Sequence, residues 1–167
     1  MASIIISACI VVGIVGLDQL TKYLTDGLRN VQIIKDILYI SSTRNTGAAF
    51  SMLGNAPWAQ TFFLILTVVA VSGATVYLVI NKRGSMWLNV TIAIIIAGAL
   101  GNFIDRLALK GVRDFIYVTF FANFNVADIA ITVGAIMLVI YVLFLDKDAL
   151  FKIKKKDGAG ENKDENA

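Results

Sequence analysis

The chain of 167 residues is too apolar for an ordinary water-soluble domain, since 57% of its residues are hydrophobic and only 16% are charged. Lysines near the C-terminus account for much of its net charge of +3, a pattern that favours anionic lipid headgroups over nucleic acid. Histidine is absent, which excludes Ser-His-Asp, Cys-His and histidine–metal chemistry. The composition therefore predicts one compact membrane domain.

Four segments are long and apolar enough to cross a bilayer, because a helix needs roughly 20 residues to span about 30 Å of hydrocarbon. They are residues 4–24, 58–80, 86–104 and 124–145; the first is interrupted by Asp18 and Lys22, whereas the second and third are almost purely apolar. The predicted fold class is an all-α membrane protein of four transmembrane helices with a small extracytoplasmic β-rich cradle and loop. We expect residues 1–150 to form a single domain and residues 151–167 to be a polar, disordered tail.

The stretch between the first two spans has a different pattern. Residues 31–43 are rich in β-branched and aromatic side chains, which favour strands, and Asn45-Thr46-Gly47 offers a turn. We expect a small sheet on the outer membrane surface.

The even number of spans places both termini on one side of the membrane. The basic cluster at positions 147–156 and the Lys82-Arg83 connector predict that this side is cytoplasmic. Residues 25–57 and 105–123 then lie outside, together with the outer helix ends. This topology gathers the unusual polar residues at the outer face: Asp18, Lys22, Asn45, Asn102, Asp105, Arg106, Asp114, Asn125 and Asp128.

Two Asn-x-x-Asp patterns stand at helix ends, Asn102 to Asp105 after the third span and Asn125 to Asp128 before the fourth. Positions i and i+3 share a helical face, so each asparagine can hydrogen-bond its aspartate. Asp128 also meets the positive end of a helix dipole. Two carboxyl groups close together in low dielectric share a proton, one acting as a base towards water and the other as an acid. The patterns therefore indicate a paired-aspartate site of the aspartic protease type.

Some of these acids also have a structural interpretation. Asp105 is followed by Arg106 and lies near Arg113, so an ion pair explains it equally well. Asp18 stands four residues before Lys22 on one helical face, which favours an ion pair that braces the first helix against the outer segments.

Asp114 looks by itself like an ordinary loop acid, followed by the strand-like Ile116-Tyr117-Val118. Spacing alone leaves open whether Asp105 or Asp114 is the partner of Asp128.

Four blocks of sequence, which together cover nearly all of the folded chain, resemble the lipoprotein signal peptidases, or type II signal peptidases. These are membrane aspartyl proteases of bacteria. The blocks are Asp18-Gln19-Leu20-Thr21-Lys22, Arg44-Asn45-Thr46-Gly47-Ala48-Ala49-Phe50, Gly101-Asn102-Phe103-Ile104-Asp105-Arg106 with Val112-Arg113-Asp114-Phe115, and Phe124-Asn125-Val126-Ala127-Asp128.

The resemblance implies that Asp114 and Asp128 are the catalytic pair and that Asp105 is a supporting residue. It implies cleavage of a diacylglyceryl-modified prolipoprotein just before the lipidated cysteine, with no cofactor and no metal. It further implies supporting or substrate-binding roles for Asn102, Arg106, Asn125, Asn45, Gly47, Asp18 and Lys22.

The implied partners are lipidated prolipoproteins and membrane phospholipids, without nucleic acid, and we expect a monomer. The implied location is the bacterial cytoplasmic membrane, with the active site near the extracytoplasmic face. Two features depart from the family pattern: Arg113 replaces an apolar residue, and the stretch between Asp114 and Asp128 is shorter than usual.

Two other functions fit the composition. A small transporter or ion-coupling protein would carry acids near mid-bilayer, whereas here they gather at one edge. A non-catalytic lipid-binding or assembly subunit would tolerate a neutral substitute for either Asp114 or Asp128.

Overall fold

The computed structural model describes residues 2–47, 56, 58–81 and 84–145. Its helices are α1 (Ala2–Thr25), α2 (Ala59–Ile80), α3 (Met86–Leu109) and α4 (Val126–Ile140), and α4 continues as a π-helical turn, η2 (Tyr141–Leu145). Within the described residues, four helices are long and apolar enough to cross a membrane, counting α4 and η2 as one. The predicted tail 151–167, the basic positions 147–156 and Lys82-Arg83 lie outside the described residues.

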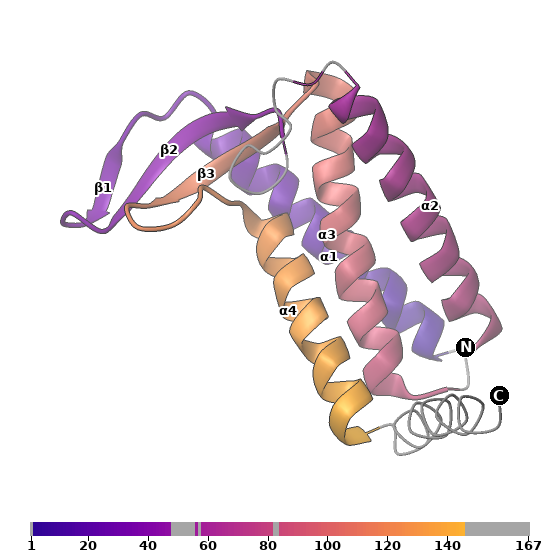
Figure 1. Cartoon of the computed structure of the whole chain (residues 1–167). Coiled ribbons are helices and arrows are strands. Elements are labelled where there is room, and N and C mark those ends of the chain that lie inside the picture. The colour runs from indigo at the N-terminus through magenta and orange to yellow at the C-terminus, as the bar shows by residue number, and fades with distance from the viewer. Residues whose placement is uncertain (1, 48–55, 57, 82–83, 146–167) are drawn as a thin grey trace, which may run out of the picture.

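Helix α3 is the centre of the bundle and contacts α1, α2 and α4 (Figure 1). Its buried residues include Ala93 and Ala97, both fully inaccessible to solvent. A Cβ atom on Gly98 would lie 2.4 Å from the carbonyl oxygen of Ala127, so glycine permits the close approach of α3 and α4. Helix α2 packs on the bundle chiefly through α3.

A three-stranded antiparallel sheet, ordered β1 (Val31–Ile34), β2 (Leu38–Asn45) and β3 (Val112–Val118), caps the end of the bundle where α1 ends and α4 begins (Figure 1). This confirms the predicted fold class. The β1–β2 turn occurs at Asp36, which has a φ of 56°. The predicted turn at Asn45-Thr46-Gly47 follows β2, where the Gly47 N–H donates to Asn45 Oδ1 at 2.9 Å.

Two predictions about the segments next to the sheet were wrong. Helix α3 continues to Leu109 instead of ending at residue 104. The helix can include these polar residues because Asp105 pairs with Arg113 and Arg106 lines the cavity at that end of the bundle. Asp114 is not a loop acid but lies within β3, where it pairs with Thr43 of β2. The sheet therefore carries Asp114 to the same end of the bundle as the start of α4.

Candidate active site

Asp114 is buried, with 2% of its surface exposed, although it belongs to a short outer strand. The Thr43 hydroxyl donates to the Asp114 carbonyl oxygen at 3.0 Å, which fixes the backbone. Its carboxyl group accepts hydrogen bonds from the side-chain amides of Asn125 at 2.6 Å and Asn45 at 3.1 Å. Asn45 can only present its NH₂ group here, because its Oδ1 accepts the Gly47 N–H at 2.9 Å. Amide donors on two sides thus hold the Asp114 carboxyl group.

Asp128 occupies the third position of α4 in a capping box with Asn125. The Asp128 N–H donates to Asn125 Oδ1 at 3.0 Å, and the Asn125 N–H donates to Asp128 Oδ2 at 3.1 Å. This confirms the predicted pairing within the second Asn-x-x-Asp pattern. The pairing within the first pattern was wrong, since Asn102 does not turn to Asp105 but donates from Nδ2 to Asp128 Oδ1 at 2.8 Å.

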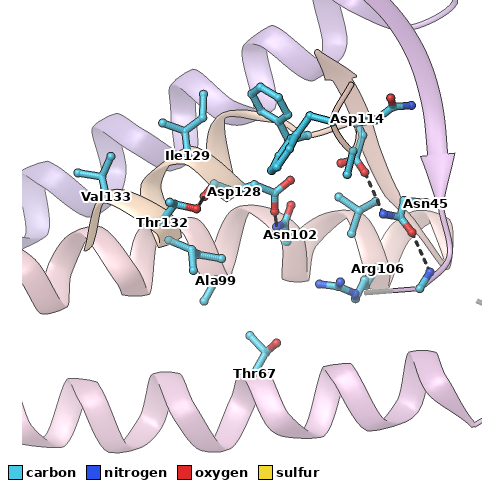
Figure 2. A pocket seen from close by; sticks show the side chains of 17 residues that line it. Asn45, Thr67, Ala99, Asn102, Arg106, Asp114, Asp128, Ile129, Thr132 and Val133 are labelled. Atoms are coloured by element: carbon cyan, nitrogen blue, oxygen red, sulfur yellow. Dashed lines mark hydrogen bonds between the residues drawn. The ribbon is translucent and has the colours of Figure 1, made fainter. Parts of the chain in front are cut away.

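The two carboxyl groups line one cavity of about 590 Å³ (Figure 2). Asn125 links them, because the same side chain donates to Asp114 and accepts from the Asp128 backbone. Residues from α2, α3 and α4 form one part of the wall, including Thr67, Ala99, Ile129, Thr132 and Val133. Figure 2 shows Thr67 of α2 facing the α3 and α4 side chains across this space. The cavity is therefore a groove with acids at one end and a mainly apolar continuation.

Arg106 lines the same cavity from α3. Its guanidinium carbon lies 5.0 Å from the centroid of the Phe63 ring on α2, within range of a cation–π interaction. Its Nε is buried and has no hydrogen-bond partner among the described residues. Arg106 thus brings to the groove a positive charge and an N–H donor that no described residue accepts.

The Asp114 carboxyl group holds its proton more strongly than an exposed aspartic acid. Burial raises its pKa from 3.8 to about 6, and the negative charge of Asp128 adds to this effect. The amide hydrogen bonds oppose the shift without cancelling it. A pair in which one carboxyl group stays protonated towards neutral pH can act as an acid and a base together.

Asp105 is fully buried but does not line this cavity. It forms hydrogen bonds with Arg113, to Nη2 at 2.8 Å and Nε at 3.2 Å, and accepts the Arg113 backbone N–H at 2.9 Å. Lys22 Nζ lies 3.5 Å from Asp105 Oδ2, the oxygen that also accepts from Arg113 N and Nε. The hydrogen bonds to Asp105 raise the pKa of Arg113. Asp105 is therefore neutralised by cations, and its arginine partner is Arg113 and not its neighbour in sequence, Arg106.

Asp18 and Lys22 form the predicted ion pair, at 2.8 Å and without solvent exposure. We expected this ion pair to hold α1 against the outer segments, but its closest hydrogen bonds are to helices. Asp18 Oδ1 accepts the Ala127 N–H of α4 at 2.9 Å, and Lys22 donates to Asn102 Oδ1 of α3 at 3.1 Å. The ion pair thus joins α1 to α3 and α4 beneath the sheet.

Comparison with known proteins agrees with this arrangement. The sequence profile of the family described as signal peptidase (SPase) II matches residues 10–144. The chain belongs to the signal peptidase II family. The predicted enzyme class, an aspartic peptidase of the signal peptidase II type, is thereby confirmed.

Relatives of this chain include bacterial lipoprotein signal peptidases. The lipoprotein signal peptidase of Streptococcus agalactiae is 42% identical over 142 residues, which cover 81% of this chain and 90% of the relative. That of Bacillus velezensis is 38% identical over 135 residues, covering 76% and 86%. With the four apolar helices, these relatives support a multi-pass bacterial membrane protein.

A solved structure, described as a bacterial membrane enzyme determined by the in meso method at 2.3 Å resolution, resembles the whole fold. It superposes with a TM-score of 0.75 at 34% identity and covers 85% of this chain and 90% of the other. A second, at 1.9 Å resolution, gives a TM-score of 0.73 at 35% identity and covers 83% and 92%.

Sequence reasoning missed two side chains of the signal peptidase II that support the site. Gln19 donates to Asp105 at 3.3 Å and accepts from Arg113 at 3.2 Å, which ties α1 to α3 and β3. Thr43 holds the backbone at Asp114. Gln19 stands inside a recognised sequence block, but nothing local reveals partners more than 80 residues away. The role of Thr43 follows only from the strand register.

Proposed function

We propose that this signal peptidase II removes the signal peptide from diacylglyceryl-modified prolipoproteins by cleavage immediately before the lipidated cysteine, using Asp114 and Asp128 to activate water. One observation carries the assignment: Asp114 and Asp128 are the only acidic side chains among the described residues that line the groove. Asp105, the alternative partner, is held outside it by Arg113 and Lys22.

The proposed chemistry uses one proton shared by the pair. The ionised carboxylate takes a proton from a water molecule, and the protonated carboxyl group donates to the oxygen of the scissile carbonyl. The proton gained by the first carboxylate then passes to the leaving amide nitrogen. Asn45, Asn102 and Asn125 donate to the carboxyl oxygens and keep both groups directed to the same point. We assign these asparagines to positioning.

The groove supplies binding. Its apolar wall on α3 and α4 suits acyl chains and an apolar signal helix, which enter sideways from the bilayer. Arg106, whose Nε has no partner in the described part of the chain, is the side chain we assign to backbone carbonyls or the lipid of the substrate. Gly47, beside Asn45 in the wall, belongs to the substrate cradle. Confinement in the membrane then fixes the depth of the cleavage site.

The same proposal includes the orientation. The start of α1 and the end of α4 lie at one end of the bundle, and β3 and the start of α4, which carry the aspartates, lie towards the other (Figure 1). We place the termini in the cytoplasm and the aspartates at the extracytoplasmic face, in a monomeric single domain surrounded by phospholipid. Reporter domains fused to each terminus and to the β1–β2 turn test this placement.

The decisive measurement is processing of a purified diacylglyceryl prolipoprotein by the wild type and by Asp114→Asn and Asp128→Asn. Each variant should lose at least about a thousandfold in rate, since a neutral amide can neither take nor give the proton. Asp36→Asn is the matched control, because this acid lies in the β1–β2 turn, away from the groove. It should process normally.

Mass spectrometry of the product determines whether cleavage falls before the lipidated cysteine. Turnover by a folded Asp114→Asn or Asp128→Asn protein would refute the dyad and favour a non-catalytic or differently catalysed role. Unlipidated prolipoprotein provides a second control, and its equal cleavage would refute the requirement for acyl chains.

A further inference from the structure

A second hollow, of about 230 Å³, lies between the end of α1 and the sheet. Arg44 and Arg113 line it, and they face each other across β2 and β3. Successive side chains of a strand point to opposite faces, so these arginines lie on the face opposite to Asn45 and Asp114. The hollow is therefore separate from the aspartate groove. The segment after α1 supplies Arg29 and Asp26.

The hollow carries more positive charge than the described residues neutralise. Of its three arginines, only Arg113 forms an ion pair with a described residue, which is Asp105. Arg29, Arg44 and Asp26 form no ion pair with any described residue, so the hollow retains one net positive charge after Asp26 is counted. Like charges directly opposite on paired strands are destabilising, as at Arg44 and Arg113, and a bound anion would relieve this repulsion.

The hollow lies at the depth expected for lipid headgroups. Helix α1 has 24 residues, or about 36 Å at roughly 1.5 Å per residue, slightly more than about 30 Å of hydrocarbon. The hollow begins at Asp26, directly after the helix. Tyr23 and Leu24 on the last turn, and Leu28 in the hollow wall, are exposed apolar side chains. They provide a surface for acyl chains below the arginines.

We propose that this hollow binds the phosphate group of an anionic glycerophospholipid, of which phosphatidylglycerol is the simplest example. Guanidinium groups bind phosphate oxygens with paired hydrogen bonds. One net positive charge matches the single negative charge of phosphatidylglycerol, whereas the choline of phosphatidylcholine brings a second cation to a basic site. A free phosphate ion has the same recognition chemistry without acyl chains, so the experiment must separate these two sources.

The test is native mass spectrometry of the full-length protein in detergent, with phosphatidylglycerol and phosphatidylcholine of identical acyl chains added in equal amounts. The wild type should retain phosphatidylglycerol preferentially. Removal of each exposed arginine should lower this affinity about fivefold, and Arg29→Gln with Arg44→Gln about 25-fold. The matched control is Lys35→Gln, which removes an exposed cation of the neighbouring turn outside the hollow and should keep the wild-type affinity.

Three results would overturn the proposal: equal retention of both lipids by the wild type, unchanged retention by the double variant, or an equal loss in Lys35→Gln. A competition arm identifies the source, since inorganic phosphate binding as tightly as phosphatidylglycerol would make this a soluble anion site. Circular dichroism checks folding of each variant. Should the double variant misfold, Arg29→Gln alone must still show the fivefold loss.

Discussion

Replacing Asp114 by asparagine should change the stability of the protein in a pH-dependent way. Burial, with the nearby charge of Asp128, raises the pKa of Asp114 from 3.8 to about 6 in the folded state. Because the folded pKa exceeds the unfolded value, the native state is relatively favoured below pH 3.8 and loses that advantage as the pH rises through 6. With about 1.4 kcal/mol for each pKa unit, ionised Asp114 costs the native state about 3 kcal/mol.

Asparagine removes this titration but creates a local conflict. The amides of Asn45 and Asn125 are both turned to donate to position 114, and other hydrogen bonds hold them in that orientation. One oxygen of Asp114 becomes an NH₂ group that faces a donor, at a cost of about 2 kcal/mol. Asp114→Asn should therefore be about 2 kcal/mol less stable than the wild type at pH 4 and about 1 kcal/mol more stable at pH 8.

The assay is unfolding by sodium dodecyl sulfate in mixed micelles, followed by circular dichroism at pH 4, 6 and 8. Asp36→Asn is the matched control, and its difference from the wild type should not reverse sign. The reasoning about buried charge would be refuted if the stability difference of Asp114→Asn were constant from pH 4 to pH 8. A larger destabilisation at pH 8 than at pH 4 would refute its sign.

Three further measurements bear on the site and its frame. The kcat/KM for prolipoprotein processing should fall as the pH rises through about 6, because Asp114 then loses the shared proton; a flat profile contradicts this. Asp105→Asn should lower stability by about 3 kcal/mol, since it leaves its basic partners short of one carboxylate, while the folded enzyme keeps turning over; an inactive, folded variant contradicts it. Gly98→Ala should destabilise by about 1 to 3 kcal/mol through its clash with Ala127, whereas Gly13→Ala, with no neighbour within 4 Å, should not; equal effects in SDS unfolding would contradict this.

The transmembrane helices were predictable because hydrophobic length is a local property. The spans begin and end within a few residues of the predicted limits, apart from the end of α3. Sheet pairing is not local: Thr43 and Asp114 are 71 residues apart in the chain. Composition therefore indicated a sheet near residues 31–45, but it could not reveal that β3 completes it and carries Asp114.

Spacing left the choice between Asp105 and Asp114 open for a geometric reason. Three residues along a helix correspond to about 300° of rotation, so Asn102 and Asp105 differ by about 60° in direction. That difference suffices for Asn102 to reach Asp128 on α4 while Asp105 reaches Arg113. An i, i+3 pattern predicts a shared face only approximately, and between three packed elements a rotation of this size selects a different neighbour.

The acids at this end of the bundle differ most in what neutralises them. Asp18 and Asp105 have ammonium or guanidinium partners, so their charges are balanced and their role is to hold α1, α3 and β3 together. In the described part of the chain, no cationic group hydrogen-bonds to the carboxyl groups of Asp114 and Asp128, which amide donors orient instead. An amide fixes the direction of a carboxyl group without supplying a compensating charge, so repulsion between the two persists. Burial, with this repulsion added, retains a proton on Asp114, which supports the proposal that this pair, among all the acids gathered here, activates water.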